Sequence, residues 1–160
     1  MLFDVRIDIF FEFNIPERFP LTPTDKLLLQ NARFYEAFEN ADIETLASVW
    51  NHSNSVKCIH PGWHLLEGWE AIRQSWISIC SSNAAMKISL RNIEAEIYGK
   101  LGIVTLVEEI TYTAQSSIRT GAVVATNIFQ LIDDKWKMIH HQGSPVIPTK
   151  EQVDDSYRYN

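Results

Sequence analysis

The sequence predicts an α+β domain in which three helices pack on one face of a strongly curved antiparallel sheet. Two observations lead to this class. The first half of the chain holds three segments with apolar residues at helical spacing, whereas the second half holds four long runs of alternating apolar and polar residues. Short polar turns separate these runs, which indicates an antiparallel meander. The length of 160 residues suits one domain.

The first two helices have recognisable start signals. Thr22 is a good N-cap, Pro23 suits the first helical position, and Asp25 stands where a capping-box acid belongs. The stripe of this helix that faces the core comprises Leu27, Asn31, Phe34 and Phe38. Asn40 is expected to end the helix in a left-handed conformation, and Asp42 to cap the second helix. The apolar face of the second helix comprises Ile43, Leu46, Ala47 and Trp50.

A strand, a turn and a third helix follow. Residues 55–60, "SVKCIH", read as a strand with Val56, Cys58 and His60 on one face. "PGWHLLEG" reads as a turn with a short return, and residues 69–80 as a helix. The apolar stripe of that helix comprises Trp69, Ile72, Trp76 and Ile79.

Alternation in the strand-like runs at 85–99, 101–114, 121–133 and 134–144 predicts their inner faces. Glu108 and Asn127 fall in apolar rows, so both should point toward the helices. In the last run the lysines belong in water, which places His140 inward. His60, Glu108, Asn127 and His140, with Cys58 beside His60, would then form a polar network or line a wet cavity, because unpaired buried polar groups cost about 1–3 kcal/mol.

The opposite face of the predicted sheet is half apolar. Val124, Thr126, Ile128 and Ile132 lie on it. Exposed patches of this kind mark interfaces, so we expect a homodimer through the outer sheet face.

The two ends of the chain differ from the middle. Residues 1–23 form an N-terminal extension with a strand-like alternation, which is open to three interpretations: an extra edge strand, an arm onto a partner subunit, or translated sequence upstream of the true start. Residues 24–146 form the predicted domain, and residues 147–160 a polar C-terminal tail.

Composition excludes several classes of partner. The formal net charge of -6 argues against nucleic acid, which requires a clustered basic face. Apolar runs stay far below the roughly 18 residues of a transmembrane helix, so no membrane partner is expected. The N-terminus is a poor signal peptide, and the two cysteines do not resemble a disulfide framework. A cytoplasmic location is therefore the expectation.

The element order, together with "VWNHSNSVKCIHPGWHLLEGWEAIRQSW" and "WKMIHHQGSP", resembles the SnoaL-like group of the nuclear-transport-factor-2-like superfamily over residues 24–146. The resemblance implies a cone-shaped fold with a pocket at its open end, commonly in a dimer. It leaves the activity open, because the superfamily includes isomerases, dehydratases, hydrolases, cyclases, kinase association domains and transport factors. The Tyr-plus-two-Asp set of ketosteroid isomerase and the Asp-Arg-Asp set of limonene epoxide hydrolase have no counterpart here, and the inward histidines with one acid are only loosely similar to scytalone dehydratase.

Three residues are candidates for catalysis: Glu108, His60 and His140. In an apolar cavity the pKa of Glu108 should rise, which suits proton abstraction near neutral pH. The alternative is that Glu108 pairs with His140 or His60 and stabilises the fold. His60 and Cys58 could form a thiol–imidazole pair, or a buried hydrophobe beside a histidine bonded to the backbone.

The predicted ligand pocket consists of Trp50, Cys58, Trp63, Trp76, Tyr112, Asn127 and Phe129. Trp50 and Trp76 could equally serve core packing, and Trp63, after the Pro-Gly turn, is expected to roof the pocket. Asn127 would orient a ligand carbonyl or satisfy a neighbour. Pro61 and Gly62 interrupt the spacing between His60 and His64, so no metal site is expected.

These residues predict a small-molecule-binding protein. It could be a cofactor-independent isomerase, dehydratase or cyclase that transfers protons on a small apolar carbonyl compound, with His140 and Asn127 polarising the oxygen. The alternative is a non-catalytic ligand-binding or oligomerisation module.

Overall fold

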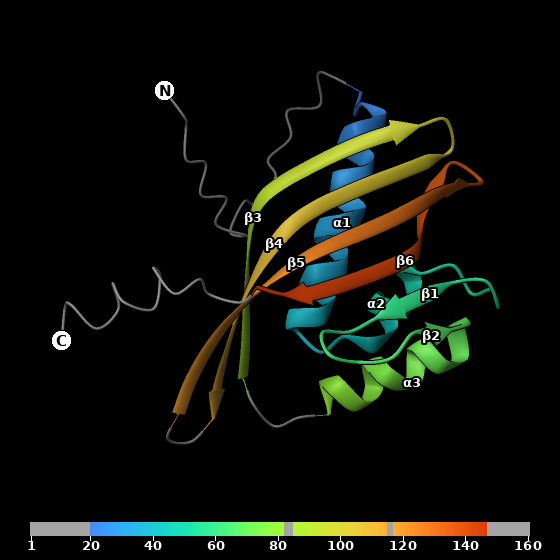
Figure 1. Cartoon of the computed structure of the whole chain (residues 1–160). Coiled ribbons are helices and arrows are strands. Elements are labelled where there is room, and N and C mark those ends of the chain that lie inside the picture. Colours follow the sequence, from blue (N-terminus) through green and yellow to red (C-terminus); the bar gives the residue numbers. More distant parts are fainter. Residues whose placement is uncertain (1–19, 82–84, 115–116, 147–160) are drawn as a thin grey trace, which may run out of the picture.

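Three helices lie on one face of a curved, unclosed sheet of six strands in the computed structural model (Figure 1). The structure describes residues 20–81, 85–114 and 117–146. Residues 1–19 of the predicted extension and the predicted tail lie outside the described residues. The α+β class, with the helices in the first half of the chain, is confirmed.

The helices are α1 (Pro23–Glu39), α2 (Ile43–Val49) and α3 (Trp69–Cys80). The predicted start of α1 is confirmed, since Thr22 Oγ1 accepts from the Asp25 backbone N–H at 3.1 Å and the Asp25 carboxylate accepts from the Thr22 N–H at 2.9 Å. Asp42 caps α2 through the Thr45 N–H, also as predicted.

The end of α1 differs from the prediction. Asn40 has φ −85° and is not left-handed. Ala41 takes that role with φ +53°, because the Asp42 N–H turns back to the Ala37 carbonyl and the chain must reverse within one residue. A left-handed conformation at a residue with a Cβ costs about 1–2 kcal/mol, and this turn therefore carries strain.

The strands are β1 (Lys57–Ile59), β2 (Leu66–Glu67), β3 (Ala85–Tyr98), β4 (Leu101–Ala114), β5 (Ser117–Ile132) and β6 (Lys135–Pro145). Their order in the sheet is β2-β1-β6-β5-β4-β3. The predicted meander of β3 to β6 is confirmed. The sheet is mixed rather than wholly antiparallel, because β1 pairs with β6 in parallel. The long connection between them, through α3 and four strands, permits this orientation.

The core fills the concave side of the sheet, around α1. Leu27, Phe34 and Trp76 are almost completely buried there. A Cβ on Gly102 of β4 would lie only 2.7 Å from Leu27 Cδ2, so the glycine allows α1 to approach the sheet closely. Within the described residues, no helix combines the length and the apolar character needed to cross a membrane.

A bulge in β6 changes which histidine faces inward. Ile128 of β5 pairs with His140, but its neighbour Phe129 pairs with Met138, so Ile139 is an extra residue. The side-chain alternation therefore shifts by one after Met138. His141 is 3% exposed and faces the helices, whereas His140 does not, so the predicted inward placement of His140 is wrong.

Candidate functional site

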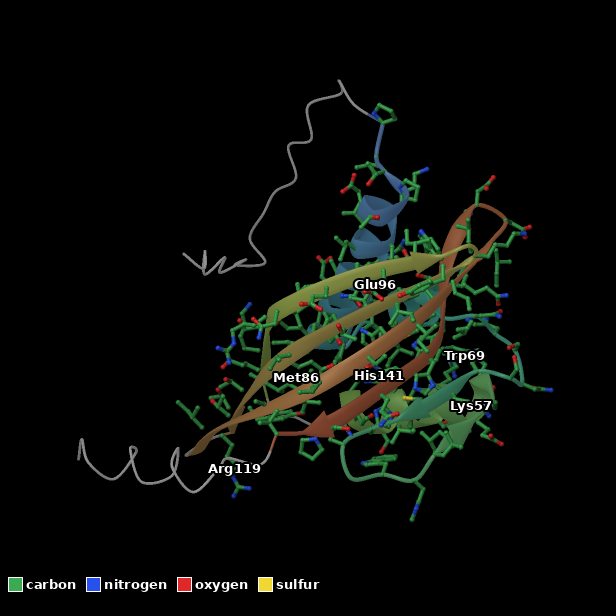
Figure 2. All side chains as sticks on the ribbon, turned by 45° about the horizontal axis from the view of Figure 1, so that its top comes forward. Lys57, Trp69, Met86, Glu96, Arg119 and His141 are labelled. Atoms are coloured by element: carbon green, nitrogen blue, oxygen red, sulfur yellow. The ribbon has the colours of Figure 1, made fainter. Side chains whose placement is uncertain are left out.

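A set of polar side chains is buried between the helices and the concave side of the sheet. We call it the inner cluster; it comprises Asn31, Tyr35, Cys58, His60, Ser75, Glu108, Asn127 and His141. His141, labelled in Figure 2, lies on β6 near the middle of the fold. The members come from six elements rather than from one segment: α1, α3, β1 with the residue that follows it, β4, β5 and β6.

A hydrogen-bonded chain connects α1 to three strands. Tyr35 Oη donates to Glu108 Oε1 at 2.7 Å. Asn127 Nδ2 donates to Asn31 Oδ1 at 2.8 Å and to Tyr35 Oη at 3.0 Å. Both amide protons of Asn127 are thereby used, so this residue holds its neighbours in place.

The same chain defines the protonation of His141. Its Nδ1 lies 2.6 Å from Asn127 Oδ1, and an amide oxygen can only accept. Nδ1 therefore carries the proton and Nε2 keeps a free lone pair. Burial, followed by the nearby His60 and His140, lowers the pKa of His141 to about 3, so the ring is neutral at physiological pH.

His60 is the opposite tautomer. Ser75 Oγ donates its one proton to the Ile72 carbonyl at 2.7 Å, so it must accept at 2.8 Å from His60 Nε2–H. Burial lowers the pKa of His60 to about 4. Cys58 Sγ lies 3.8–3.9 Å from the ring nitrogens, and burial raises the pKa of its thiol. The pair is therefore neutral thiol and neutral imidazole rather than an activated ion pair.

Glu108 is the titratable carboxyl of the cluster. It is 3% exposed. Burial raises its pKa to about 7, against the opposing effect of the hydrogen bond from Tyr35. Oε1 accepts that bond, while Oε2 has no hydrogen-bond partner among the described residues. A carboxyl with a pKa near neutrality and a free oxygen can both accept and release a proton.

Two polar atoms of the cluster are unpaired without being completely enclosed. The fully buried side-chain atoms without a hydrogen bond, in the part of the chain that the structure describes, are Nε1 of Trp50 and Nε1 of Trp76. Glu108 Oε2 and His141 Nε2 are unpaired but not among them, so each retains some accessible surface.

The structure brings several predicted site residues together and separates others. Glu108, His60, Asn127 and Cys58 belong to the inner cluster. The ring of Trp76 packs edge-on against His60, with centroids 4.6 Å apart, and 5.8 Å from His141.

The remaining predicted residues lie in the core or at the surface. Trp50 and Phe129 are completely enclosed in the core. Trp63 is 47% exposed and touches the His60 ring edge-on at 5.0 Å, and Tyr112 is 37% exposed. His140 lies on the other side of β6 from the cluster because of the bulge at Ile139.

Sequence reasoning missed Tyr35, Ser75, Asn31 and His141 as site residues. Asn31 was detectable, because it interrupts an otherwise apolar helical stripe. Tyr35 and Ser75 carried no local signal, and the bulge concealed His141. Among the described residues, no three His, Cys, Asp or Glu side chains lie close enough to hold a metal ion.

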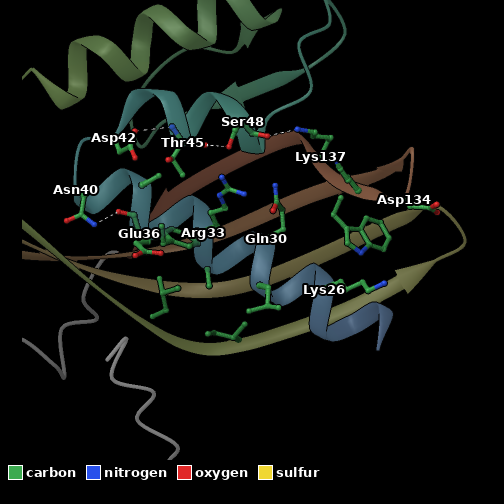
Figure 3. A pocket seen from close by; sticks show the side chains of 18 residues that line it. Lys26, Gln30, Arg33, Glu36, Asn40, Asp42, Thr45, Ser48, Asp134 and Lys137 are labelled. Atoms are coloured by element: carbon green, nitrogen blue, oxygen red, sulfur yellow. Dashed lines mark hydrogen bonds between the residues drawn. The ribbon is translucent and has the colours of Figure 1, made fainter. Parts of the chain in front are cut away.

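A separate groove of about 1040 Å³ runs over the outward face of α1 and α2 (Figure 3). It contains charges of both signs, including Arg33, Lys137, Glu36 and Asp42. Lys137 donates to the Ser48 carbonyl. The hydrogen bonds from Thr45 lower the pKa of Asp42, and the charge of Arg33 adds a smaller effect in the same direction. None of the site residues predicted from the sequence lines this groove.

Comparisons with known proteins agree on a family. The model of the SnoaL-like domain matches residues 29–148. A candidate dehydratase of the NTF2-like family from Streptomyces avermitilis is 31% identical, with a TM-score of 0.72, over 78% of this chain and 96% of that one. A candidate calcium/calmodulin-dependent protein kinase type II association domain from Thiobacillus denitrificans is 26% identical, with a TM-score of 0.69, over 81% of this chain and 100% of that one.

One curated relative is a plant protein. The F-box protein SKIP8 of Arabidopsis thaliana is 24% identical over 130 residues, which are 81% of this chain and 54% of that protein. The chain thus spans about half the length of this relative.

Proposed function

The chain belongs to the SnoaL-like family of the NTF2-like superfamily, and on that basis we propose that it binds a small, mostly apolar molecule and transfers protons on it by general acid/base catalysis. Glu108 is the proposed acid/base. The observation that carries the proposal is its buried carboxyl, with a pKa of about 7 and one oxygen that accepts no hydrogen bond within the described part of the chain. Isomerisation, dehydration or cyclisation of a carbonyl compound would suit this group, and none of these reactions requires an organic cofactor.

The hydrogen bonds assign supporting roles to the neighbours of Glu108. Tyr35 orients the carboxyl through Oε1. Asn127 uses both amide protons and its oxygen within the cluster, so it is a positioning residue rather than a group that polarises a ligand. His141, not His140, provides the second unpaired acceptor of the cluster, Nε2.

The test begins with the ligand. Native mass spectrometry of gently purified protein would detect a retained small molecule, which is then assayed for turnover. We expect Glu108→Gln to lower kcat by on the order of 100-fold or more, because it removes the acid/base. Glu109→Gln is the matched control: the adjacent carboxyl pairs with Arg91 on the outer face and should change kcat less than about twofold.

The pH dependence provides a second readout. If Glu108 acts as the base, kcat/KM should rise through a pH near 7 in the wild-type protein and lose that step in Glu108→Gln. Equal turnover by wild type and Glu108→Gln would rule out this mechanism.

A second candidate function is assembly without catalysis. It is supported by the 26% identity to a candidate kinase association domain and by the half-apolar outer face of β4 and β5. On that face Val107 pairs with Val124, which is 48% exposed, and Ile103 pairs with Ile128. We propose that a homodimer forms through this face, which is compatible with either function.

A cytoplasmic location is part of the proposal. Its support is that Cys58 and Cys80 are free thiols, which suits a reducing compartment.

A further inference from the structure

Four cationic side chains line the groove over the outward face of α1 and α2. Lys26 and Arg33 come from α1, where they lie two turns apart and therefore on one face of the helix. Lys135 and Lys137 come from the start of β6, where they are separated by one residue and share a side of the strand. Two elements that are distant in the sequence thus bring like charges to one groove.

These cations have no ion pair with a described residue. The ion pairs among the described residues use other basic side chains, which all lie outside the groove: Lys57, Arg73, Lys87 and Arg91. Lys137 donates to the Ser48 carbonyl, whereas Arg33 makes no hydrogen bond to the part of the chain that the structure describes. The guanidinium of Arg33 and the remaining protons of the Lys137 ammonium are therefore available to a ligand.

Three of the cations are close enough to repel one another. Burial lowers the pKa of Lys137, and the charges of Lys135 and Arg33 lower it further. Figure 3 shows Gln30, Arg33 and Lys137 extending toward α2 from α1 and β6, with Lys137 bonded to Ser48. A hollow surface that concentrates one sign of charge attracts ligands of the opposite sign. We call this set the basic site; it comprises Gln30, Arg33, Lys135 and Lys137.

The acids that share the groove do not neutralise the basic site. Asp42 accepts from the Thr45 N–H as the cap of α2, and the charge of Arg33 is the smallest cause of its lowered pKa. Glu36 and Asp134 are exposed, and neither forms an ion pair with a residue that the structure describes. An anion bound between α1 and β6 would supply the missing negative charge.

We propose that the basic site binds the phosphate group of a small phosphate monoester, with Arg33 and Lys137 donating to its oxygens. Such a group carries about two negative charges at neutral pH and three acceptor oxygens, which matches several cations better than one carboxylate does. The planar guanidinium can donate two parallel hydrogen bonds to it. The groove volume of about 1040 Å³ is that of a small-molecule site, and Leu29 and Ile93 offer an apolar part of the ester half-buried contacts.

The test compares three ligands with one ring: phenyl phosphate, benzoate and benzyl alcohol. Calorimetric titration of the full chain at about pH 7.5 gives each Kd, and the monoester is then a dianion. We expect phenyl phosphate to bind at least about tenfold more tightly than benzoate or benzyl alcohol. Inorganic phosphate should compete with it, and the NMR signal of the Arg33 side-chain N–H should shift.

Basic residues outside the groove provide matched controls. Arg33→Gln and Lys137→Met should each weaken phenyl phosphate binding by about tenfold. Arg119→Gln and Lys100→Met remove the same charge from exposed positions that do not line the groove, and should change Kd less than about twofold. Arg33 is exposed and makes no hydrogen bond to a described residue, so Arg33→Gln should fold even if Lys137→Met, which loses the Ser48 contact, does not.

Several outcomes would overturn the proposal. Equal weakening by Arg33→Gln and Arg119→Gln would show attraction to overall charge rather than a site. Benzoate binding as tightly as phenyl phosphate would remove the preference for phosphate, and no saturation below about 10 mM phenyl phosphate would remove the site. Loss of phenyl phosphate binding in Glu108→Gln would place the ligand in the inner cluster instead. The proposed acid/base role of Glu108 does not depend on any of these results, because Glu108 does not line the groove.

Discussion

Glu108 in β4 is 3% exposed, and only one of its carboxyl oxygens accepts a hydrogen bond from the residues that the structure describes. Burial disfavours the ionised form, and the raised pKa of about 7 is the measure of that cost. The same burial that weakens the fold prepares the group for proton transfer near neutral pH. Stability and chemistry are therefore linked at this residue, and a stability measurement can detect the link without a substrate.

Glu108→Gln should stabilise the protein at high pH. The carboxyl has a pKa of 4.5 when unfolded and about 7 when folded, so the folded state binds more protons between these values. The stability contributed by this group is complete below pH 4.5 and is lost as pH rises through 7. The advantage of the variant over wild type should grow from near zero at pH 4.5 to about 3 kcal/mol at pH 8.

Urea unfolding at several pH values measures this difference. His60 and His141 act in the opposite direction, since their lowered pKa values cost stability as pH falls below 6.5. They contribute equally to both proteins, so comparing variant and wild type at each pH cancels them. A difference that does not change with pH would contradict the raised pKa of Glu108, and Glu109→Gln should show no such trend.

At the scale of elements, the α1–α2 junction stores strain. Ala41 has φ +53° and is exposed, so its Cβ makes no compensating core contact. The junction is short because Asp42 caps α2 directly after it. Strain at this point is a consequence of joining two helices without a longer loop.

Replacing Ala41 should relieve that strain. We expect Ala41→Gly to raise the free energy of unfolding by about 0.5–1 kcal/mol, because glycine adopts positive φ without a Cβ clash. The matched control is Ala32→Gly, at an exposed position inside α1, which should lower it by about 1 kcal/mol. Thermal or urea unfolding compares the two, and equal destabilisation by both would contradict a strained Ala41.

The bulge in β6 is the element-level feature that shapes the site. If β6 kept a regular alternation with no bulge, His140 would face the cluster and His141 the outside. The bulge also allows Trp136 and Met138 to remain in the core while a histidine reaches Asn127. The bulge therefore determines which of the two histidines belongs to the inner cluster.

At the scale of the whole molecule, the helices cover one face of the sheet and leave the other open. In Figure 1 the outer surfaces of β4 and β5 face away from α1. The pairs Val107–Val124 and Ile103–Ile128 make this face partly apolar. A second copy of the chain would shield it.

A charge on this face should separate the proposed dimer. Val124→Lys is expected to shift the mass in solution from dimer to monomer at micromolar concentration, because two lysines would meet across the interface. Leu65→Lys is the control, since Leu65 is 49% exposed but lies outside the strands of that face. Light scattering after gel filtration reports both masses. A dimer that survives Val124→Lys would place the interface elsewhere.

The sequence by itself determined the elements and most of the buried polar residues. Local patterns, set by residues a few positions apart, were sufficient to predict three kinds of feature. These are the cap formed by Thr22 and Asp25, the three helical stripes and the four long strands. Glu108 and Asn127 were placed inward correctly because β4 and β5 keep a period of two up to these positions. The family resemblance rested on the same ordered elements.

Only the tertiary structure decided how these residues meet. The parallel position of β1 beside β6 joins segments about 80 residues apart, and no local pattern encodes it. Tyr35 became the partner of Glu108 because α1 crosses the concave side of the sheet at that level. His141 replaced His140 because a bulge depends on the neighbouring strand rather than on alternation within β6. Periodicity predicts which face a side chain occupies, whereas packing between distant segments decides what it contacts.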